Sequence, residues 1–418
     1  MICIFSLGCK VNSYESDVLR AELESHNLKV TTNLEYADIY VINTCAVTNL
    51  AERKSRQCIA RVLKQNPNAT IYVMGCASQK NTNQFEKYDN VKFITGNKDK
   101  QKVSQIILNK CNDYLKVDSL EIDNNYIAHG NAKQSNLRAY VKIQDGCNNF
   151  CSYCIIPYLR GRSRSRKLEH IVDEVKQLDN LGVKEIVLTG IDMSDYQIDG
   201  KKALGELIER LSFYSGRIRL GSLEVGIITK DFVNQIKKIK NLCPQFHLSL
   251  QSGDDSVLKS MNRKYTTEQY FQAVNLLRQN FENPAITTDL IVGFPTETEQ
   301  CFNNTCRFVE KVGFAQMHIF PYSSREGTVA SKMYKVLQSD VIQNRLKHIN
   351  QIAIKMQEEY ILQNQNKTLS LLIEEKIGDY YYGYTDNYIK IRTKQNVQIG
   401  QCYAVQLEKD KNFEVVKK

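Results

Sequence analysis

The chain has 418 residues, enough for two or three domains, and a formal net charge of +10 from 56 Lys and Arg against 46 Asp and Glu. This excess fits a polyanionic partner, but solubility alone explains it equally well. An odd number of cysteines, 13 in all, argues against a secreted disulfide framework, so we expect reduced thiols in the cytoplasm. The sequence predicts neither a signal peptide nor a membrane span, because no apolar stretch reaches the ~18 residues a spanning helix needs.

Residues 1–111 alternate between apolar runs and helical patterns, which predicts a parallel sheet with helices on its faces. The expected strands are Met1–Ser6, Ile39–Asn43, Thr70–Met74 and Val91–Thr95. Cys9, Cys45 and Cys76 follow the first three strands, so all three lie at one carboxyl edge, where open α/β sheets bind ligands. This shared position favours a metal cluster held by the three thiols over the alternative of three unrelated buried cysteines.

Residues 112–137 are polar and rich in Asn, and we expect a linker there. From residue 138 to residue 335 a strand followed by a helix recurs six times. The expected strands are Ala139–Gln144, Glu185–Thr189, Arg217–Leu223, Gln245–Leu250, Ala285–Val292 and Ala315–Phe320. Six units fall short of the eight in a closed barrel, so we expect an open (β/α)6 partial barrel with its site at the carboxyl ends of the strands.

The first of these strands leads into a loop, Gly146–Cys154, with the spacing C-x-x-x-C-x-x-C. Cys147, Cys151 and Cys154 can therefore aim at one point, and thiolates favour soft metals and iron–sulfur clusters. Three ligands from one loop leave one iron of a four-iron cluster open to a substrate. The alternatives are a structural zinc site or buried free thiols, but zinc usually pairs two Cys-x-x-Cys knuckles and no second knuckle follows.

The run GCNNFCSYCIIPYLRGRSRSR, which starts at Gly146, resembles the radical S-adenosylmethionine (SAM) methylthiotransferases. The strings LGCKVN, NTCAVTN and GCASQ resemble the three N-terminal cysteine motifs of the same family. The resemblance covers nearly the whole chain and implies two [4Fe-4S] clusters, one at each cysteine triad, with SAM as cofactor and tRNA as substrate. We also expect a sulfur source, an electron donor of the flavodoxin or ferredoxin type, and a monomer.

The reaction that the resemblance implies replaces an adenine C2–H bond by C–SCH3, and no side chain is a strong enough base for that, so the cofactor carries the chemistry. The motif Gly8–Asn12, GCKVN, resembles the branch that acts on N6-threonylcarbamoyladenosine at tRNA position 37. The isopentenyladenosine branch, which usually has Gln-Met after the cysteine, is the alternative. A hypothesis from a different class is a non-enzymatic iron–sulfur regulator that binds RNA.

Polar residues at the strand ends of the barrel are the expected cofactor contacts, because their common edge favours a site over ordinary loop positions. These residues are Gly190, Asp192, Glu224, Gln251, Ser252 and Asp289. Arg160 is expected to bind an anion such as the SAM carboxylate, and Arg162, Arg164 and Arg166 to meet RNA phosphates. The alternative is a solvated run of charges.

Residues 336–366 carry an apolar stripe at helical spacing, which predicts a connecting helix. Residues 367–418 hold five short strand patterns, typical of a small antiparallel barrel, and resemble the RNA-binding TRAM domain. Lys390, Arg392 and Lys394 alternate along one of these strands near a run of tyrosines, and we expect them to bind RNA. An ordinary solvated surface is the alternative. The predicted fold class is therefore α/β, with a small β-domain at the end.

Overall fold

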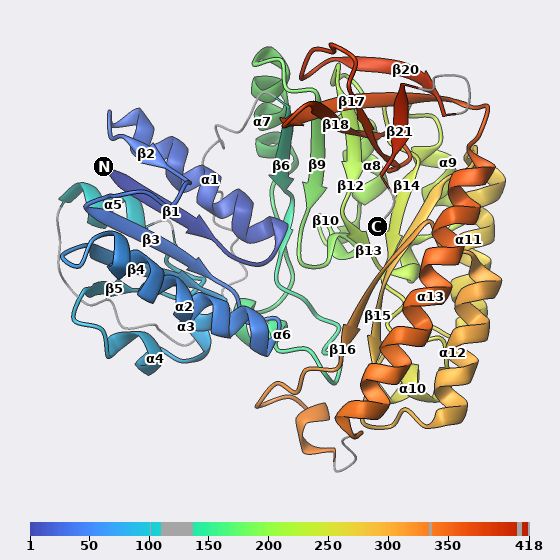
Figure 1. The fold of residues 1–418 in the computed structure, drawn as a ribbon, viewed down its shortest axis with the longest axis horizontal. Coiled ribbons are helices and arrows are strands. Elements are labelled where there is room, and N and C mark those ends of the chain that lie inside the picture. The colour runs from blue at the N-terminus through green and yellow to red at the C-terminus, as the bar shows by residue number, and fades with distance from the viewer. Residues whose placement is uncertain (101, 110–136, 334–336, 408–411, 417–418) are drawn as a thin grey trace.

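A computed structural model describes residues 1–100, 102–109, 137–333, 337–407 and 412–416. The N-terminal sheet domain lies beside an open half-barrel, and the C-terminal sheet covers one end of that half-barrel (Figure 1). The predicted linker 112–137 lies outside the described residues except for Leu137. Within the described ranges, no helix has the length and apolar character needed to cross a bilayer.

The N-terminal domain is a five-stranded parallel sheet in the order β2-β1-β3-β4-β5. Its strands are β1 Ile2–Ser6, β2 Val30–Thr31, β3 Ile39–Thr44, β4 Thr70–Gly75 and β5 Val91–Ile94. Its helices are α1 Lys10–Ser25, α2 Asn49–Gln65, α3 Cys76–Lys80, α4 Asn83–Glu86 and α5 Lys102–Asn109. The four predicted strands are confirmed; β2 was missed because two residues carry no readable pattern. Apolar cores lie on both faces of the sheet, as expected for parallel strands.

The central domain is an open half-barrel of parallel strands. Its strands are β6 Arg138–Lys142, β9 Glu185–Thr189, β12 Arg217–Leu220, β13 Ser222–Leu223, β14 Gln245–Leu248, β15 Ala285–Val292 and β16 Gln316–Pro321. Helices α7 Leu168–Asn180, α8 Leu204–Arg210, α9 Lys230–Ile236, α11 Thr267–Asn280 and α12 Glu299–Val312 lie between them. All six predicted strands are confirmed, and the third is divided at Gly221 into β12 and β13.

Short elements at the carboxyl ends of these strands surround the cysteine loop. They are β7 Gln144–Asp145, α6 Ile156–Arg160, β8 Arg164–Ser165, η1 Met193–Asp195, β10 Gln197–Ile198, β11 Lys201–Lys202, η2 Val225–Ile227, α10 Asp255–Ser260 and η3 Ala330–Lys332. The active end of the half-barrel is thus built from loops and single turns, as is usual for this architecture.

The C-terminal part starts with the predicted long helix, α13 Ser339–Gln363, which packs against the barrel. Five antiparallel strands follow: β17 Thr368–Ile377, β18 Tyr380–Thr385, β19 Lys390–Thr393, β20 Cys402–Gln406 and β21 Phe413–Val415. All five strands were predicted. Their order is β20-β17-β18-β19-β21, so within the described residues the sheet is a small antiparallel half-barrel, in agreement with the predicted fold class.

The cysteine loop is joined to the N-terminal domain by the segment that follows it. Ile155 and Leu159 are buried in the apolar core of that domain, although they belong to the barrel sequence. On the far side of the interface, Arg325 forms an ion pair with Glu52 of α2. The N-terminal domain is therefore attached to the barrel on two sides of the loop.

Candidate active site

The three-cysteine loop turns sharply where it leaves β7. Gly146 has φ of +72°, and a Cβ there would lie 2.0 Å from the carbonyl oxygen of Arg162, so only glycine fits. The Cys154 N–H donates to the Cys151 carbonyl oxygen at 2.9 Å, which closes the loop on itself. Burial raises the pKa of Cys147 to about 12, and the thiols of Cys154 and Cys151 add to this rise. The three sulfurs are thus close enough to influence one another.

A segment from the other side of the half-barrel, residues 260–263, holds this loop in place. Ser152 Oγ donates to the Ser260 carbonyl oxygen at 2.8 Å. Asn262 Nδ2 donates to the Phe150 carbonyl oxygen at 2.9 Å. The loop therefore has a fixed shape before any metal enters, because its backbone is bonded to a rigid neighbour.

Arg263 completes this contact and was not predicted. Its Nη1 donates to Cys151 Sγ at 3.3 Å, and its Nη2 donates to Glu224 Oε2 at 2.5 Å. Its side chain is only 4% exposed. Arg263 thus holds Cys151 and Glu224 in fixed positions beside each other.

A pocket of about 260 Å³ opens beside Cys151. Two predicted residues, Asp192 and Glu224, line it together with the unpredicted Arg263. The other lining residues are Asn148, Asn149, Ser194, Asp195, Lys202, Gly226, Ile227, Asn262, Lys264 and Tyr265. Charged side chains of both signs line the pocket, which suits the charged groups of a zwitterionic amino acid.

Asp192 is the acidic group nearest the first cysteine. Asn149 Nδ2 donates to Asp192 Oδ2 at 2.8 Å, and the same oxygen lies 3.9 Å from Cys147 Sγ. Burial, together with the charges of Glu224 and Asp195, raises the pKa of Asp192 to about 6. Its other oxygen, Oδ1, is buried without a hydrogen-bond partner among the described residues, so it is available to a ligand.

The predicted Gly190 lies behind the pocket and packs against Gln144. A Cβ at Gly190 would lie 3.0 Å from Gln144 Oε1. That oxygen accepts hydrogen bonds from the N–H groups of Ile191 (3.0 Å) and Asp192 (2.8 Å). Gln144, which was not predicted, therefore orients the turn that carries Asp192.

Two more predicted contacts, Gln251 and Ser252, are also outside the pocket lining. Gln251 has φ of +66°, and its N–H donates to the Asp289 carbonyl oxygen at 2.9 Å. Ser252 is buried, with its Oγ 3.5 Å from Thr305 Oγ1. Both residues shape the strand end, and their expected role in binding SAM stays a prediction.

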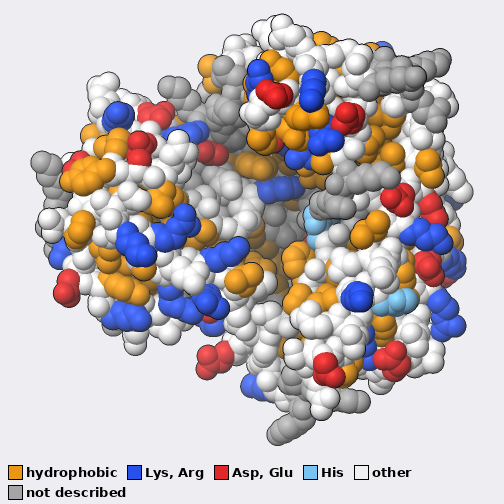
Figure 2. All heavy atoms as spheres, in the orientation of Figure 1, with side chains coloured by type: hydrophobic (Ala, Val, Ile, Leu, Met, Phe, Trp, Pro, Cys, Tyr) orange, Lys and Arg blue, Asp and Glu red, His pale blue; other side chains and the backbone are white. Residues whose placement is uncertain are grey.

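Asp289 of β15 lies beside one histidine on each neighbouring strand, His247 and His318. Figure 2 shows a hollow between the N-terminal domain and the barrel, with Lys or Arg and His side chains on its walls. Asp289 is paired along the sheet with His318, and His247 Nε2 lies 3.3 Å from Asp289 Oδ2. Lys10 of α1 interacts electrostatically with Arg219, Arg138 and Asp289 of the barrel. The hollow is therefore lined by both domains.

The N-terminal cysteines meet at the carboxyl edge of their sheet, as predicted. A Cβ at Gly8, whose φ is +96°, would lie 2.4 Å from Cys45 Sγ, which places that sulfur against the residue preceding Cys9. Burial, together with the thiols of Cys76 and Cys9, raises the pKa of Cys45 to about 11. Asn97 Nδ2 donates to Cys76 Sγ at 3.5 Å.

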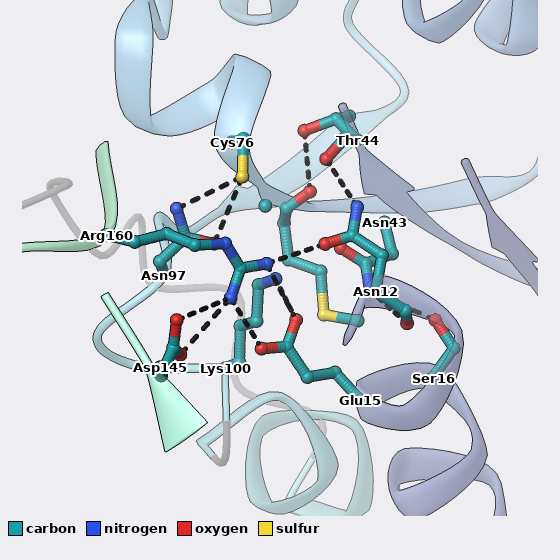
Figure 3. Close-up of polar contacts among 12 residues, drawn as sticks. Asn12, Glu15, Ser16, Asn43, Thr44, Cys76, Asn97, Lys100, Asp145 and Arg160 are labelled. Carbon is teal, nitrogen blue, oxygen red and sulfur yellow. Dashed lines mark hydrogen bonds and ion pairs between the residues drawn. The ribbon is translucent and has the colours of Figure 1, made fainter. Parts of the chain in front are cut away.

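A buried network of charges lies between the two triads, with Arg160 at its centre (Figure 3). Arg160 Nη1 is 3.0 Å from Glu15 Oε1 and 3.1 Å from Asp145 Oδ1. Lys100 and Lys142 also form ion pairs with Glu15. Three cations thus face two carboxylates, and the excess positive charge lies beside Cys9 and Cys76, whose charges act on Arg160. Burial raises the pKa of Cys9, and the charge of Arg160 partly offsets that rise.

This placement corrects our expectation for Arg160. We expected it at a cofactor, but its side chain is 1% exposed and its guanidinium is occupied by carboxylates. Arg166 is likewise buried and paired with Glu174, so it cannot meet RNA phosphates at the surface as we expected. Arg162 is exposed and stacks on the Phe150 ring, and Arg164 is partly exposed, so their assignment to RNA stays a prediction.

The chemistry of both triads fits iron–sulfur clusters, in which each thiolate binds a different iron. Every cysteine of both triads is a free thiol. The donor set, sulfur alone, is also the set that clusters use.

The C-terminal sheet presents a basic and aromatic face. Tyr382 is paired across the strands with Arg392, and Tyr384 with Lys390, so these side chains share one face. Lys390 Nζ lies 5.1 Å from the centre of the Tyr382 ring. Lys394, the third predicted cation, lies 4.9 Å from the Tyr380 ring. Figure 1 shows this sheet above the half-barrel, next to β6 and β9.

Two family models match the chain. Residues 141–309 match the radical SAM superfamily, and residues 1–96 match a family described as uncharacterized protein family UPF0004. The structure is similar to the radical SAM methyltransferase TsrM from Kitasatospora setae, with a TM-score of 0.57 at 14% identity, over 76% of this chain and 72% of that one. A three-cysteine loop at the end of a half-barrel thus defines a radical SAM protein.

Curated relatives narrow this class. The threonylcarbamoyladenosine tRNA methylthiotransferases MtaB of Bacillus subtilis and Chlamydia pneumoniae are 35% and 36% identical, over 98% and 96% of this chain and 94% of each relative. The tRNA-2-methylthio-N(6)-dimethylallyladenosine synthase of Thermoanaerobacter pseudethanolicus is 38% identical over 89% of this chain and 81% of the relative. The chain belongs to the radical SAM tRNA methylthiotransferase family.

Proposed function

We propose that the protein is a tRNA methylthiotransferase that converts N6-threonylcarbamoyladenosine at tRNA position 37 to its 2-methylthio derivative. The observation that carries the activity is the presence of two separate three-cysteine sites in one chain, one at each side of a buried charge network. The choice of this branch is supported by relatives of that name, of whose length the chain covers 94%.

The loop thiols Cys147, Cys151 and Cys154 would hold one [4Fe-4S] cluster with an open iron, and SAM would occupy the adjoining pocket. When bound, the cluster and SAM supply one-electron chemistry that opens an unactivated C–H bond. Arg263 keeps Cys151 and Glu224 in fixed positions. Asp192, with its unpartnered Oδ1, is suited to accept a hydrogen bond from the cofactor.

Cys9, Cys45 and Cys76 would hold a second [4Fe-4S] cluster. The excess positive charge around Arg160 would offset the negative charge of three thiolates at this buried site. Because the thiols of Cys9 and Cys45 have raised pKa values through burial, loading the metal must release their protons.

The C-terminal half-barrel is suited to act as a TRAM-like RNA-binding domain. Lys390, Arg392 and Lys394 would contact phosphates, and the tyrosines beside them would stack on unpaired bases. Arg162 and Arg164 would add phosphate contacts near the loop. We further propose a cytoplasmic monomer that receives electrons from a flavodoxin or ferredoxin and takes its sulfur from a separate source.

Mass spectrometry of tRNA nucleosides from a strain lacking the gene tests this function. We expect the 2-methylthio derivative of threonylcarbamoyladenosine to disappear and to return when the intact gene is restored. Loss of the isopentenyl counterpart would reassign the branch. If neither changes, and reduced protein with SAM yields no 5′-deoxyadenosine, an iron–sulfur RNA-binding regulator becomes the better account.

A further inference from the structure

The hollow between the N-terminal domain and the barrel contains a cation that none of the roles above uses. Lys10 is the first residue of α1 and directly follows Cys9. It is exposed, and α1 packs against β6 of the barrel. Lys10 therefore lies where the N-terminal domain meets the barrel.

The position of α1 directs Lys10 toward the barrel. Tyr14, one turn later, is fully buried and packs with Tyr140 of β6, and Tyr14 Oη lies within hydrogen-bonding distance of Glu174 and Arg166. Residues four apart lie on the same face of a helix. Lys10 therefore lies on the barrel face of α1, at the end where the helix meets the hollow.

The charged neighbours of Lys10 already form ion pairs with other residues. Arg138 Nε is 2.7 Å from Glu185 Oε1, and Arg219 Nε is 3.0 Å from the same oxygen. Asp289 lies against His247. Lys10 itself has no hydrogen bond or ion pair with any residue that the structure describes. Its ammonium group is thus free to receive an anion that enters the hollow.

The hollow leads to the basic and aromatic face of the C-terminal sheet. Arg138 lies over the Tyr384 ring at 5.9 Å, and Arg219 lies over the Tyr388 ring at 5.2 Å. Tyr384, Tyr388 and Lys390 line a further pocket of about 210 Å³ shared with the barrel. An RNA held on the C-terminal face can therefore extend a nucleoside toward Lys10.

We propose that Lys10 is a specificity-determining residue that binds the carboxylate of the substrate's threonyl group; this inference rests on the proposed function. The threonylcarbamoyl group ends in a carboxylate, whereas a dimethylallyl group is an uncharged hydrocarbon. An ion pair between the Lys10 ammonium and the threonyl carboxylate would favour binding of the threonylcarbamoyl group. A dimethylallyl group would displace water from Lys10 without offering it a hydrogen-bond partner, which would weaken binding of that substrate.

The experiment compares RNA binding by cluster-loaded protein in the absence of turnover. The probes are three anticodon stem–loops that carry threonylcarbamoyladenosine, its carboxyl methyl ester or dimethylallyladenosine. We expect the wild-type protein to bind the acid about 10- to 100-fold more tightly than the ester, the range for a hydrogen-bonded charge. Equal binding of acid and ester by the wild-type protein overturns the proposal, whatever any variant does.

Variants then locate the preference. Lys10→Met should reduce the acid-to-ester ratio to within about threefold, and Lys10→Arg should keep most of it, because charge and reach are retained. Lys29→Met, at an exposed position between α1 and β2, is the matched control and should leave the ratio unchanged. An unchanged ratio in Lys10→Met overturns the proposal.

Two further measurements separate this inference from its rivals. Iron content and the spectrum of the oxidised clusters should be the same in Lys10→Met as in wild type, which excludes an effect through Cys9. SAM affinity should also be unchanged; a loss of SAM affinity with an intact acid-to-ester ratio would assign Lys10 to the cofactor and overturn the proposal. If the wild-type protein prefers the dimethylallyl RNA, the proposed function fails as well.

Discussion

The two cysteine triads differ in how the chain brings their thiols together. Cys147, Cys151 and Cys154 lie within one loop that is fixed by hydrogen bonds to residues 260–263. Cys9, Cys45 and Cys76 come from the ends of three strands and meet only when the sheet has formed. A site on one loop depends on local geometry, whereas a gathered site depends on the whole domain. The predictions below test whether this difference governs cluster loading and function.

The largest effect should come from removing one thiol of either triad. Cys151→Ala should abolish cleavage of SAM to 5′-deoxyadenosine, because the open iron loses its support. Cys45→Ala should retain part of that cleavage but make no methylthio product. Each variant should lose about four of about eight irons, as expected for two four-iron clusters. Iron analysis, chromatography of the nucleoside and mass spectrometry of tRNA measure these outcomes.

Cys306→Ala is the control for this pair, since Cys306 is a buried core residue outside both triads. It should keep all the iron and the full activity. Equal loss of SAM cleavage in Cys151→Ala and Cys45→Ala would contradict two separate centres.

The site formed by Cys9, Cys45 and Cys76 should also lose its cluster when a backbone position near it is altered. In Gly8→Ala the new Cβ would lie 2.4 Å from Cys45 Sγ, at a residue with φ of +96°. We expect loss of about four irons while the loop cluster remains. Gly182→Ala is matched for backbone strain, because φ is +74° there and no atom lies within 4 Å. It should keep all the iron, and a fully loaded Gly8→Ala protein would refute the gathered geometry.

A moderate effect on stability should come from the charge network between the triads. Arg160→Met removes one buried ion pair from Glu15 and one from Asp145, although Lys142 still contacts both, and this loss should cost about 3–5 kcal/mol in free energy of unfolding. Arg162→Met is the exposed neighbour and should cost less than about 1 kcal/mol, because it loses only its stacking on Phe150. Denaturant unfolding measures both. Similar losses of unfolding free energy in the two variants would argue against a stabilising role of the buried charge network.

The smallest expected effect is a pH dependence of the stability of the barrel, which does not involve either cysteine triad. Burial would raise the pKa of Glu185, but the charges of Arg219, Arg138 and Arg217 outweigh burial and lower it to about 2. A lowered carboxyl pKa stabilises the fold above the unfolded value of about 4.3, and that stabilisation is lost as pH falls toward 2. It amounts to about 3 kcal/mol at neutral pH.

Thermal unfolding of wild type and Glu185→Gln between pH 7 and pH 2 tests this prediction. The difference in melting temperature should be constant above about pH 5 and should shrink below it. A difference that grows as pH falls would show that the ionised carboxylate is not what stabilises the barrel.

The sequence predicted the strands and both triads because each depends on patterns within a few residues or on the order of parallel strands. The loop spacing is visible directly, and the strand ends align once the sheet is assumed parallel. Arg263 was missed because its partner Cys151 is 112 residues away. Lys100, 85 residues from Glu15, was missed for the same reason.

The arginine run 160–166 illustrates the limit most clearly. Along the sequence its members look alike, and all were expected at an anion. In the fold, Arg160 and Arg166 are inside and paired with Glu15 and Glu174, while Arg162 is outside. Nothing local distinguishes them, because the carboxylates that neutralise them come from α1 and α7.

The insertion of Ile155 and Leu159 into the core of the first domain limits how this protein can be divided. A fragment ending before the cysteine loop would present an apolar socket to water and would tend to aggregate. The first hundred residues are therefore not an independent unit that can be exchanged by itself. Chimaeras between relatives should exchange them together with the segment that carries these two side chains.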